Sequence, residues 1–283
     1  MSISSSQSFV SRCFKSRSFV VGGLMTGFLL LCAITSLFWT PGEIYDISIA
    51  DRFLSPSLTH WFGTDQFGRD IASLLMTGTQ NSITVGVVAV SIGLSVGVTL
   101  GLTASAQRGW VEELIMRLSD FSFAFPAILS AIMITAILGP GGVNSILAIG
   151  IYNIPIFARL TRGTANAIWA REYVMAARAA GKGKFRITLE HVLPNILSII
   201  IVQVTIQFAI AILAEAALSY LGLGTQPPHP SWGRMLNEAQ SLMFFQPLQA
   251  VYPGAAIALA VFGLNLLGDG LRDVLDPRLS RKR

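Results

Sequence analysis

Residues 19–39 read FVVGGLMTGFLLLCAITSLFW, an apolar run without a single charged residue. A helix needs about 20 apolar residues to span the ~30 Å hydrocarbon core of a bilayer. Backbone polar groups must be hydrogen-bonded internally there, so each crossing is expected to be helical. Five further predominantly apolar runs follow at 82–106, 121–138, 143–160, 196–220 and 250–268. The sequence therefore predicts an all-α, polytopic membrane protein with six transmembrane helices.

The composition favours a membrane protein over a soluble one. Of the 283 residues, 52% are hydrophobic and only 12% are charged, too few to cover a soluble globule. A net charge of +5 could indicate nucleic-acid binding, but the charges lie between apolar runs rather than on a basic soluble surface. We expect a lipid surrounding, no nucleic-acid partner and, from Cys13 and Cys32 alone, no disulfide framework.

The distribution of Lys and Arg predicts the orientation. Four segments, together with Arg159 at the end of the fourth span, hold 17 of the 20 basic residues. These segments are 1–18, 107–120, 161–195 and 269–283. Because cytoplasmic loops are enriched in Lys and Arg, both termini are predicted to be cytoplasmic and segments 40–81 and 221–249 to face outward. A cleaved signal peptide is the alternative for the N-terminus, but the first run is long and lacks a small-x-small cleavage pattern.

Prolines and glycines inside the spans predict how the helices pack. Pro126, Pro155 and Pro253 each remove a backbone donor, so kinked helices supported by their neighbours are expected. The second span has small residues that permit close helix approach. They are Gly86, Gly93, Gly97 and Gly101.

The longest inward segment, 161–195, reads TRGTANAIWAREYVMAARAAGKGKFRITLEHVLPN. One helical face is predicted from the spacing of Trp169, Tyr173, Ala176, Ala177 and Ala180. Gly181 and Gly183 predict a turn, FRITLEHVL a second short helix, and Pro194 the start of the next span. The residues alone leave two interpretations open, a docking element for another protein and an interfacial helix on the anionic leaflet.

The pattern of Ala176, Ala177, Gly181, Leu193 and Pro194 resembles the EAA loop of binding-protein-dependent ABC importer permeases. The resemblance implies a helix that seats in a cleft of a cytoplasmic ATP-binding subunit and transmits its ATP-driven closure. This sequence departs from the family pattern at two positions. Met175 replaces the usual Glu and His191 the usual Ile, so a salt bridge made by that Glu is not expected here.

A second motif, GTDxxGRD, precedes the second span in the outward segment. Its residues are Gly63, Thr64, Asp65, Gly68, Arg69 and Asp70. The motif is similar to that of the second permease subunit of dipeptide, oligopeptide and nickel importers, as are MRLSDFSFAFP (116–126), SYLGLGTQPPHPSWG (219–233) and NLLGDGLRDVLDPRL (265–279). A role in gating or in meeting a binding protein is one hypothesis. The other is a plain turn, with Arg69 and Asp70 as a surface pair.

The resemblance divides the chain into five parts. They are a cytoplasmic N-terminus (1–18), a first transmembrane helix (19–39), a periplasmic loop (40–81), a core permease domain (82–268) containing the 161–195 coupling loop, and a cytoplasmic C-terminal segment (269–283). It also implies the bundle of a type I ABC importer in a bacterial inner membrane.

Polar residues inside the fifth span suggest functional positions, because such groups are costly in lipid. Gln203 and Gln207 share one helical face, and Glu215 follows two turns later. They could line a water-filled path, or they could hold the bundle together by interhelical hydrogen bonds.

Catalytic and metal-binding patterns are missing from the sequence. GKGKF at 181–185 lacks the spacing of a phosphate-binding loop, so ATP is expected to be hydrolysed by another chain. No cofactor is predicted, and His60 and His229 are interpreted as loop residues rather than nickel ligands.

The resemblance implies an importer permease for peptides, with nickel or a metal chelate as the alternative cargo. Its expected partners are ATP-binding subunits, a second homologous permease and a periplasmic solute-binding protein. A secondary transporter or channel is a weaker hypothesis, because no internal repeat is found.

Overall fold

The computed structural model describes residues 13–275, and this part of the chain is helical without a β-strand. Five long helices form the bundle: α2 (Arg17–Thr35), α3 (Ile71–Gln107), α6 (Gly142–Trp169), α9 (Leu193–Tyr220) and α11 (Leu248–Leu275). Shorter ones are α4 (Gly109–Phe123), α5 (Ala127–Leu138), α7 (Glu172–Ala179), α8 (Lys184–Ile187) and α10 (Trp232–Ala239). The predicted terminal segments lie partly outside the described residues.

Five helical runs within 13–275 are long and apolar enough to cross a membrane, and the number is six if the bent pair of α4 and α5 counts as one span. The six predicted spans correspond to the higher number. The third span is not one straight helix, however, because α4 and α5 are bent by 89° relative to each other. Pro126 lies at the bend with extended backbone (φ −58°, ψ 135°), since it cannot donate a helical hydrogen bond. Pro155 and Pro253 instead lie inside continuous helices.

Two predicted boundaries are wrong. The helix of the second span begins at Ile71 rather than at 82, because the Asp70 side chain accepts a hydrogen bond from Ser73 N and caps it. The segment 107–120, expected as a polar connection, is largely the amphipathic helix α4. Its charged residues form ion pairs with one another and with residues of α6. These pairs stabilise a helix here despite its polar side chains.

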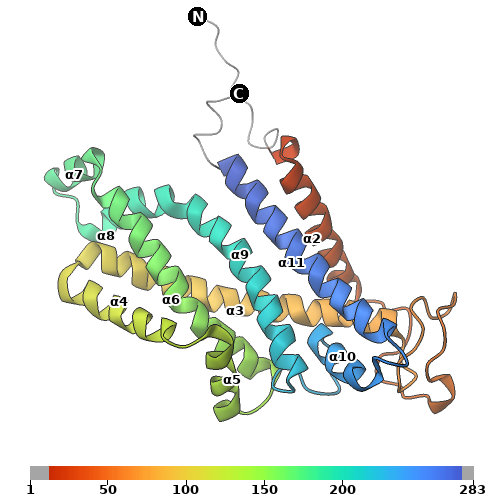
Figure 1. Ribbon diagram of the computed structural model, residues 1–283. Helices are drawn as coiled ribbons and strands as arrows, with labels where there is room; N and C mark the ends of the chain where they lie inside the picture. Colours follow the sequence, from red (N-terminus) through yellow and green to blue (C-terminus); the bar gives the residue numbers. More distant parts are fainter. Residues whose placement is uncertain (1–12, 276–283) are drawn as a thin grey trace, which may run out of the picture.

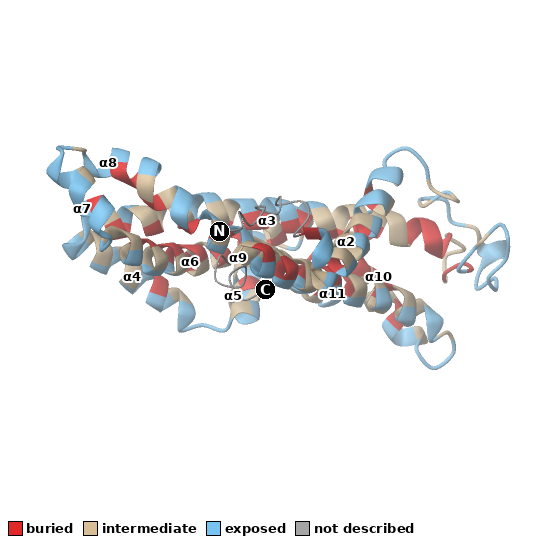
Figure 2. Ribbon diagram, turned by 90° about the horizontal axis from the view of Figure 1, so that it is seen from above, coloured by how far each residue is buried: buried red, intermediate tan, exposed pale blue. Residues whose placement is uncertain are grey.

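Glycines bring the principal helix pairs into contact. A Cβ atom on Gly93, Gly97 or Gly101 of α3 would lie 2.3–2.5 Å from atoms of α6, so only glycine permits this spacing. The predicted role of these glycines in close packing is confirmed. In the same way Gly22 of α2 and Gly270 of α11 each face the backbone of the other helix. Buried residues line the contacts between helices, while their outward faces are exposed (Figure 2).

The bundle has two distinct ends (Figure 1). At one, which we call the α7 end, lie the start of α2, the end of α11, and α7 with α8. At the other, the α10 end, lie α10 and the long connection 36–70 between α2 and α3. The two conspicuous sequence motifs are therefore separated by the length of the bundle.

Candidate functional sites

The α7 end presents the predicted helix–turn–helix. α7 ends at a turn in which Gly181 has φ +82° and Lys182 N donates to Ala177 O, five residues earlier. This is the geometry of a Schellman motif, which favours glycine at that position. Val174 and Ile187 are both buried in one apolar cluster with residues of α6 and α9. One face thus attaches the segment to the bundle, and the opposite face is free.

The exposed face differs slightly from the prediction. Trp169 is the last residue of α6, and α7 starts only at Glu172, so Trp169 does not share a helix with Tyr173. Tyr173, Ala176 and Ala180 are exposed as expected, whereas Ala177 is half-buried. The short break at 170–171 lets α7 turn away from the axis of α6.

Pro194 lies in the first turn of α9 (Leu193–Tyr220), as predicted, but no break in the chain precedes that helix. α8, a single π-helical turn (Thr188–Val192) and α9 form one continuous run, Lys184–Tyr220. In the π turn, Leu193 N donates to Thr188 O, and the Asn195 side chain donates to His191 O (2.6 Å). These bonds satisfy two of the carbonyl groups before Pro194, which itself has no N–H to donate. A run of 37 residues is about 55 Å long, so its first turns extend beyond a ~30 Å hydrocarbon core.

Glu190 ties this first part of the run to the preceding turn. Its two carboxylate oxygens accept from Arg186 Nε (2.5 Å) and Lys182 Nζ (2.6 Å). Hydrogen bonds from Arg186 and then Lys182 lower the pKa of Glu190 to about 2. The carboxylate is therefore ionised throughout the neutral range, and the pairing fixes the turn relative to α8.

At the α10 end, the two glycines of GTDxxGRD permit a tightly folded loop. Gly63 and Gly68 have φ +78° and +77°. A Cβ atom at Gly63 would lie 2.3 Å from Leu54 O, and one at Gly68 would lie 2.1 Å from Ser48 O. Both positions therefore require glycine, because of the backbone conformation and the space.

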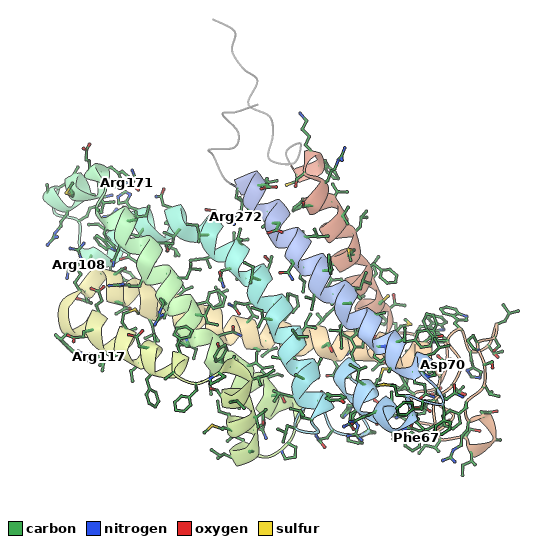
Figure 3. All side chains as sticks on the ribbon, viewed as in Figure 1. Phe67, Asp70, Arg108, Arg117, Arg171 and Arg272 are labelled. Atoms are coloured by element: carbon green, nitrogen blue, oxygen red, sulfur yellow. The ribbon has the colours of Figure 1, made fainter. Side chains whose placement is uncertain are left out.

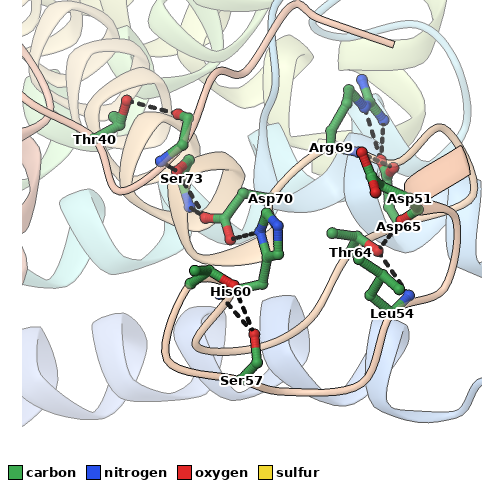
Figure 4. A network of polar contacts seen from close by, with 12 residues as sticks. Thr40, Asp51, Leu54, Ser57, His60, Thr64, Asp65, Arg69, Asp70 and Ser73 are labelled. Carbon is green, nitrogen blue, oxygen red and sulfur yellow. Dashed lines mark hydrogen bonds and ion pairs between the residues drawn. The ribbon is translucent and has the colours of Figure 1, made fainter. Parts of the chain in front are cut away.

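Asp65 organises the centre of the loop (Figure 4). One of its carboxylate oxygens accepts from Phe67 N (2.8 Å) and Arg69 N (2.9 Å), and the other accepts from Arg69 Nε (2.7 Å). Arg69 Nη2 also donates to Glu238 of α10 (2.7 Å). The alternative hypothesis of a surface pair between Arg69 and Asp70 is wrong, since Arg69 joins the loop to α10 instead.

Asp70 is buried and begins α3. Its Oδ2 accepts from Ser73 N (2.8 Å) and Ser73 Oγ (2.7 Å), and its Oδ1 lies 3.1 Å from His60 Nδ1 (Figure 4). Thr64 contributes to the same loop by accepting from Leu54 N (2.8 Å). The motif is thus a connected polar scaffold in which Gly63, Thr64, Asp65, Gly68, Arg69 and Asp70 all take part.

Of the polar residues in α9, Glu215 is completely buried. It accepts from Ser219 Oγ (2.7 Å), from Ser82 Oγ of α3 (3.1 Å) and from Thr225 Oγ1 (3.3 Å). Gln207 is also buried, and its Oε1 has no hydrogen-bond partner within the described residues, whereas Gln203 is half-buried. These contacts agree with a packing role for Glu215; a pore-lining role of the three residues stays a prediction.

Ion pairs between α4 and α6 were not anticipated from the sequence. Arg162 donates to Glu112 (2.6 Å from Nε), and Arg159 pairs with Asp120. The partners are about 40 to 50 residues apart in the chain, and 107–120 was interpreted as a connection. The one available signal was Arg159 inside an otherwise apolar run.

A helical membrane bundle with a docking-type helix–turn–helix at one end and a folded polar loop at the other is typical of the transmembrane subunit of a transporter. A family model, "Binding-protein-dependent transport system inner membrane component", matches residues 89–281. The chain belongs to this family of ABC importer permeases.

Relatives and one solved structure agree with this assignment. The chain is 44% identical over 265 residues to the dipeptide transport system permease protein DppC of Alkalihalophilus pseudofirmus, covering 94% of this chain and 87% of that one. It is 42% identical over 272 residues to the glutathione transport system permease protein GsiD of Pectobacterium atrosepticum (96% and 90% covered).

The fold resembles an inward-facing MetNI methionine ABC transporter structure with a TM-score of 0.59 at 17% identity, covering 72% of this chain and 97% of that chain. At this identity the likeness concerns the fold alone, and it confirms the predicted importer-permease bundle.

Proposed function

We propose that this permease forms half of a peptide-translocating pore in an ATP-driven importer of a bacterial inner membrane. The observation that supports a peptide cargo is the 44% identity, over 94% of the chain, to a protein named for dipeptide transport. A second relative is named for glutathione, itself a small peptide. Neither is named for nickel, so peptide is the cargo class we adopt.

We place the α7 end in the cytoplasm. Arg108, Arg171 and Arg272 lie toward this end, away from Asp70 and Phe67 at the other (Figure 3). Basic residues of the α7–α8 segment add to this concentration of positive charge. Because positively charged loops are retained on the cytoplasmic side, the α10 end would face the periplasm and a solute-binding protein.

The exposed face of α7 is our candidate contact with an ATP-binding subunit. Ala176 is small and exposed, so another protein can approach the helix closely there. Val174 and Ile187 attach the segment to the bundle from the other side. A displacement of α7 by the ATP-binding subunit would be passed to α8. Because α8 is continuous with α9, it would reach the region of Glu215 at the opposite end. A rigid helix can in this way transmit ATP-driven closure to the pore.

Solute would cross the membrane because the pore alternates between an outward-facing and an inward-facing state. The binding protein delivers peptide at the α10 end, and ATP-driven closure of the ATP-binding subunits switches two permeases between inward-facing and outward-facing arrangements. This chain would contribute one half of the pore and a second, homologous permease the other. ATP hydrolysis would belong to the separate subunits.

The test is uptake by the complete importer in proteoliposomes. The chain is reconstituted with its partner permease, ATP-binding subunits and binding protein, and uptake of labelled dipeptide is measured with and without ATP. We expect ATP-dependent uptake, lost when Ala176→Arg places a bulky charge on the exposed face of α7. Met175→Arg, exposed on the same helix but about 100° around its axis from Ala176, is the control and should retain most activity.

Two results would contradict the proposal. Uptake of dipeptide that continues without ATP would exclude an ATP-driven importer. Equal uptake by wild type and Ala176→Arg, in complexes that still contain all subunits, would show that this face of α7 does not meet the ATP-binding subunit.

A further inference from the structure

An ion pair between α4 and α6 lies open on the surface of the chain. Arg159 Nη2 of α6 donates to Asp120 Oδ1 of α4, yet the two side chains are 49% and 64% exposed. The guanidinium also lies over the ring of Phe123, with 4.4 Å from its central carbon to the ring centroid. The ring and the carboxylate together hold Arg159 in a defined orientation.

Arg159 lies inside the apolar stretch of a membrane-spanning helix. It is the one charged residue in the run 143–160 and lies near the end of that run, on the side of α7. A charged group within such a stretch is costly in lipid and usually faces a partner or a water-filled cavity. The pair therefore differs from an ion pair whose residues both lie outside the apolar runs.

The chemistry of the pair is complementary to a zwitterion. The hydrogen bond to Asp120 uses Nη2, so other N–H groups of the planar guanidinium can donate to a carboxylate. The second oxygen of Asp120 can accept from an ammonium group. A short peptide has both charges, one at each terminus.

Apolar surface adjoins these charges. Phe121 and Phe125 lie beside the break between α4 and α5 with their rings in edge contact, 5.5 Å between centroids. Both side chains are exposed. They offer a surface against which peptide side chains can pack, next to groups that would bind the termini.

We propose that Asp120 and Arg159 form a contact site for the charged termini of the peptide on its path through the membrane. The inference rests on the proposed function and names residues of this chain on the path. The site differs from the polar residues of α9, of which Glu215 is already occupied by hydroxyl groups of the protein.

The chain supplies a matched control pair. Glu113 and Arg117 also lie on α4, with Arg117 Nε 3.0 Å from Glu113 Oε1, and are 60% and 76% exposed. They are closer to the start of α4, and both belong to one helix. Neutralising both members leaves the net charge of α4 unchanged and keeps Asp120 and Arg159 in place, although Arg117 lies one turn before Asp120 and interacts with its charge.

The experiment measures dipeptide uptake and ATP hydrolysis by the complete importer with Arg159→Gln, Asp120→Asn, and the exchange Asp120→Arg with Arg159→Asp. We expect Arg159→Gln to lower uptake roughly tenfold, as for loss of a charge-assisted hydrogen bond. Co-purification of the partner permease and stimulation of ATP hydrolysis by the binding protein should persist. Glu113→Gln with Arg117→Gln should transport like wild type.

A direct readout complements uptake. A dipeptide with a photoreactive diazirine side chain is irradiated during turnover, and adducts on this chain are mapped by mass spectrometry. We expect adducts within 120–125 and 156–162 for wild type and their loss for Arg159→Gln.

Three results would overturn the inference. One is wild-type uptake by Arg159→Gln, and another is adducts only elsewhere in the chain. The third is loss of the partner permease from Arg159→Gln complexes with recovery of uptake in the exchanged variant, which would identify an interface pair. If wild type itself fails to transport dipeptide, the proposed function fails instead.

Discussion

Glu215 illustrates how a single residue organises the α10 end. Its carboxyl group accepts from Ser219 Oγ (2.7 Å), which itself accepts from Thr225 N (2.9 Å). The hydroxyl group of Ser219 therefore links Glu215 to the turn that follows α9. Ser82 of α3 and Thr225 also donate to the carboxyl group, so this costly buried group has three hydrogen-bond donors.

Gly68 gives a prediction at the scale of one residue. Gly68→Ala would place a Cβ atom 2.1 Å from Ser48 O at a positive φ, so the loop must shift. We expect a local destabilisation of about 1–3 kcal/mol, measured as faster limited proteolysis within 40–70 in detergent. The control is Gly23→Ala in α2, where a Cβ atom meets nothing within 4 Å. Equal proteolysis of both variants would show that the loop tolerates a side chain there.

At the scale of elements, the continuous helix 184–220 connects the two sites. Its π turn accommodates Pro194 without interrupting the run, so α8 and α9 are one rod rather than two hinged pieces. The broken third span behaves differently, because Pro126 leaves the backbone extended between α4 and α5. Pro194 lies in the first turn of α9, where a helix tolerates proline. Pro126 instead lies in the break between α4 and α5.

This difference predicts the effect of breaking the rod. Two glycines inserted between Val192 and Leu193 should uncouple the importer, because Gly lowers helix stability by about 1 kcal/mol per residue and allows the segments to move independently. We expect ATP hydrolysis to continue while dipeptide uptake falls severalfold. The same insertion after Phe244, in an exposed connection, should leave both unchanged. Uptake that stays coupled in the first variant would exclude the rod as the transmitting element.

At the scale of the whole molecule, the outer faces of the bundle carry exposed apolar side chains. Large apolar side chains on α2 and α11, among them Leu24, Leu31 and Phe262, are exposed on its outer faces. In a membrane such faces contact lipid or other helices without penalty. Arg108, Arg171 and Arg272 instead lie toward the α7 end (Figure 3).

The proposed orientation predicts which end reagents can reach. Cys13 and Cys32 are replaced by Ser, and a single cysteine is introduced at Leu58, 97% exposed at the α10 end, or at Phe185, 78% exposed at the α7 end. A membrane-impermeant maleimide added to spheroplasts should label Leu58→Cys, and should label Phe185→Cys only after permeabilisation. Labelling in the reverse order would invert the topology.

The sequence by itself determined the helical membrane fold, the helix–turn–helix at 161–195 and the family. Hydropathy, glycine turns and motif spacing are properties of neighbouring residues, so they can be recognised before the chain folds. The wrong start of the second helix, 82 instead of Ile71, also has a local cause, because the capping residue Asp70 lies outside the apolar run.

Only the tertiary structure decided which polar groups meet. Arg69 and Glu238 are 169 positions apart, and Ser82 and Glu215 are 133 apart, so no local pattern brings them together. The pair of Asp120 with Arg159 likewise depends on α4 packing against α6. In an apolar surrounding each polar group must find a partner, but which partner it finds is fixed by how the helices pack against one another.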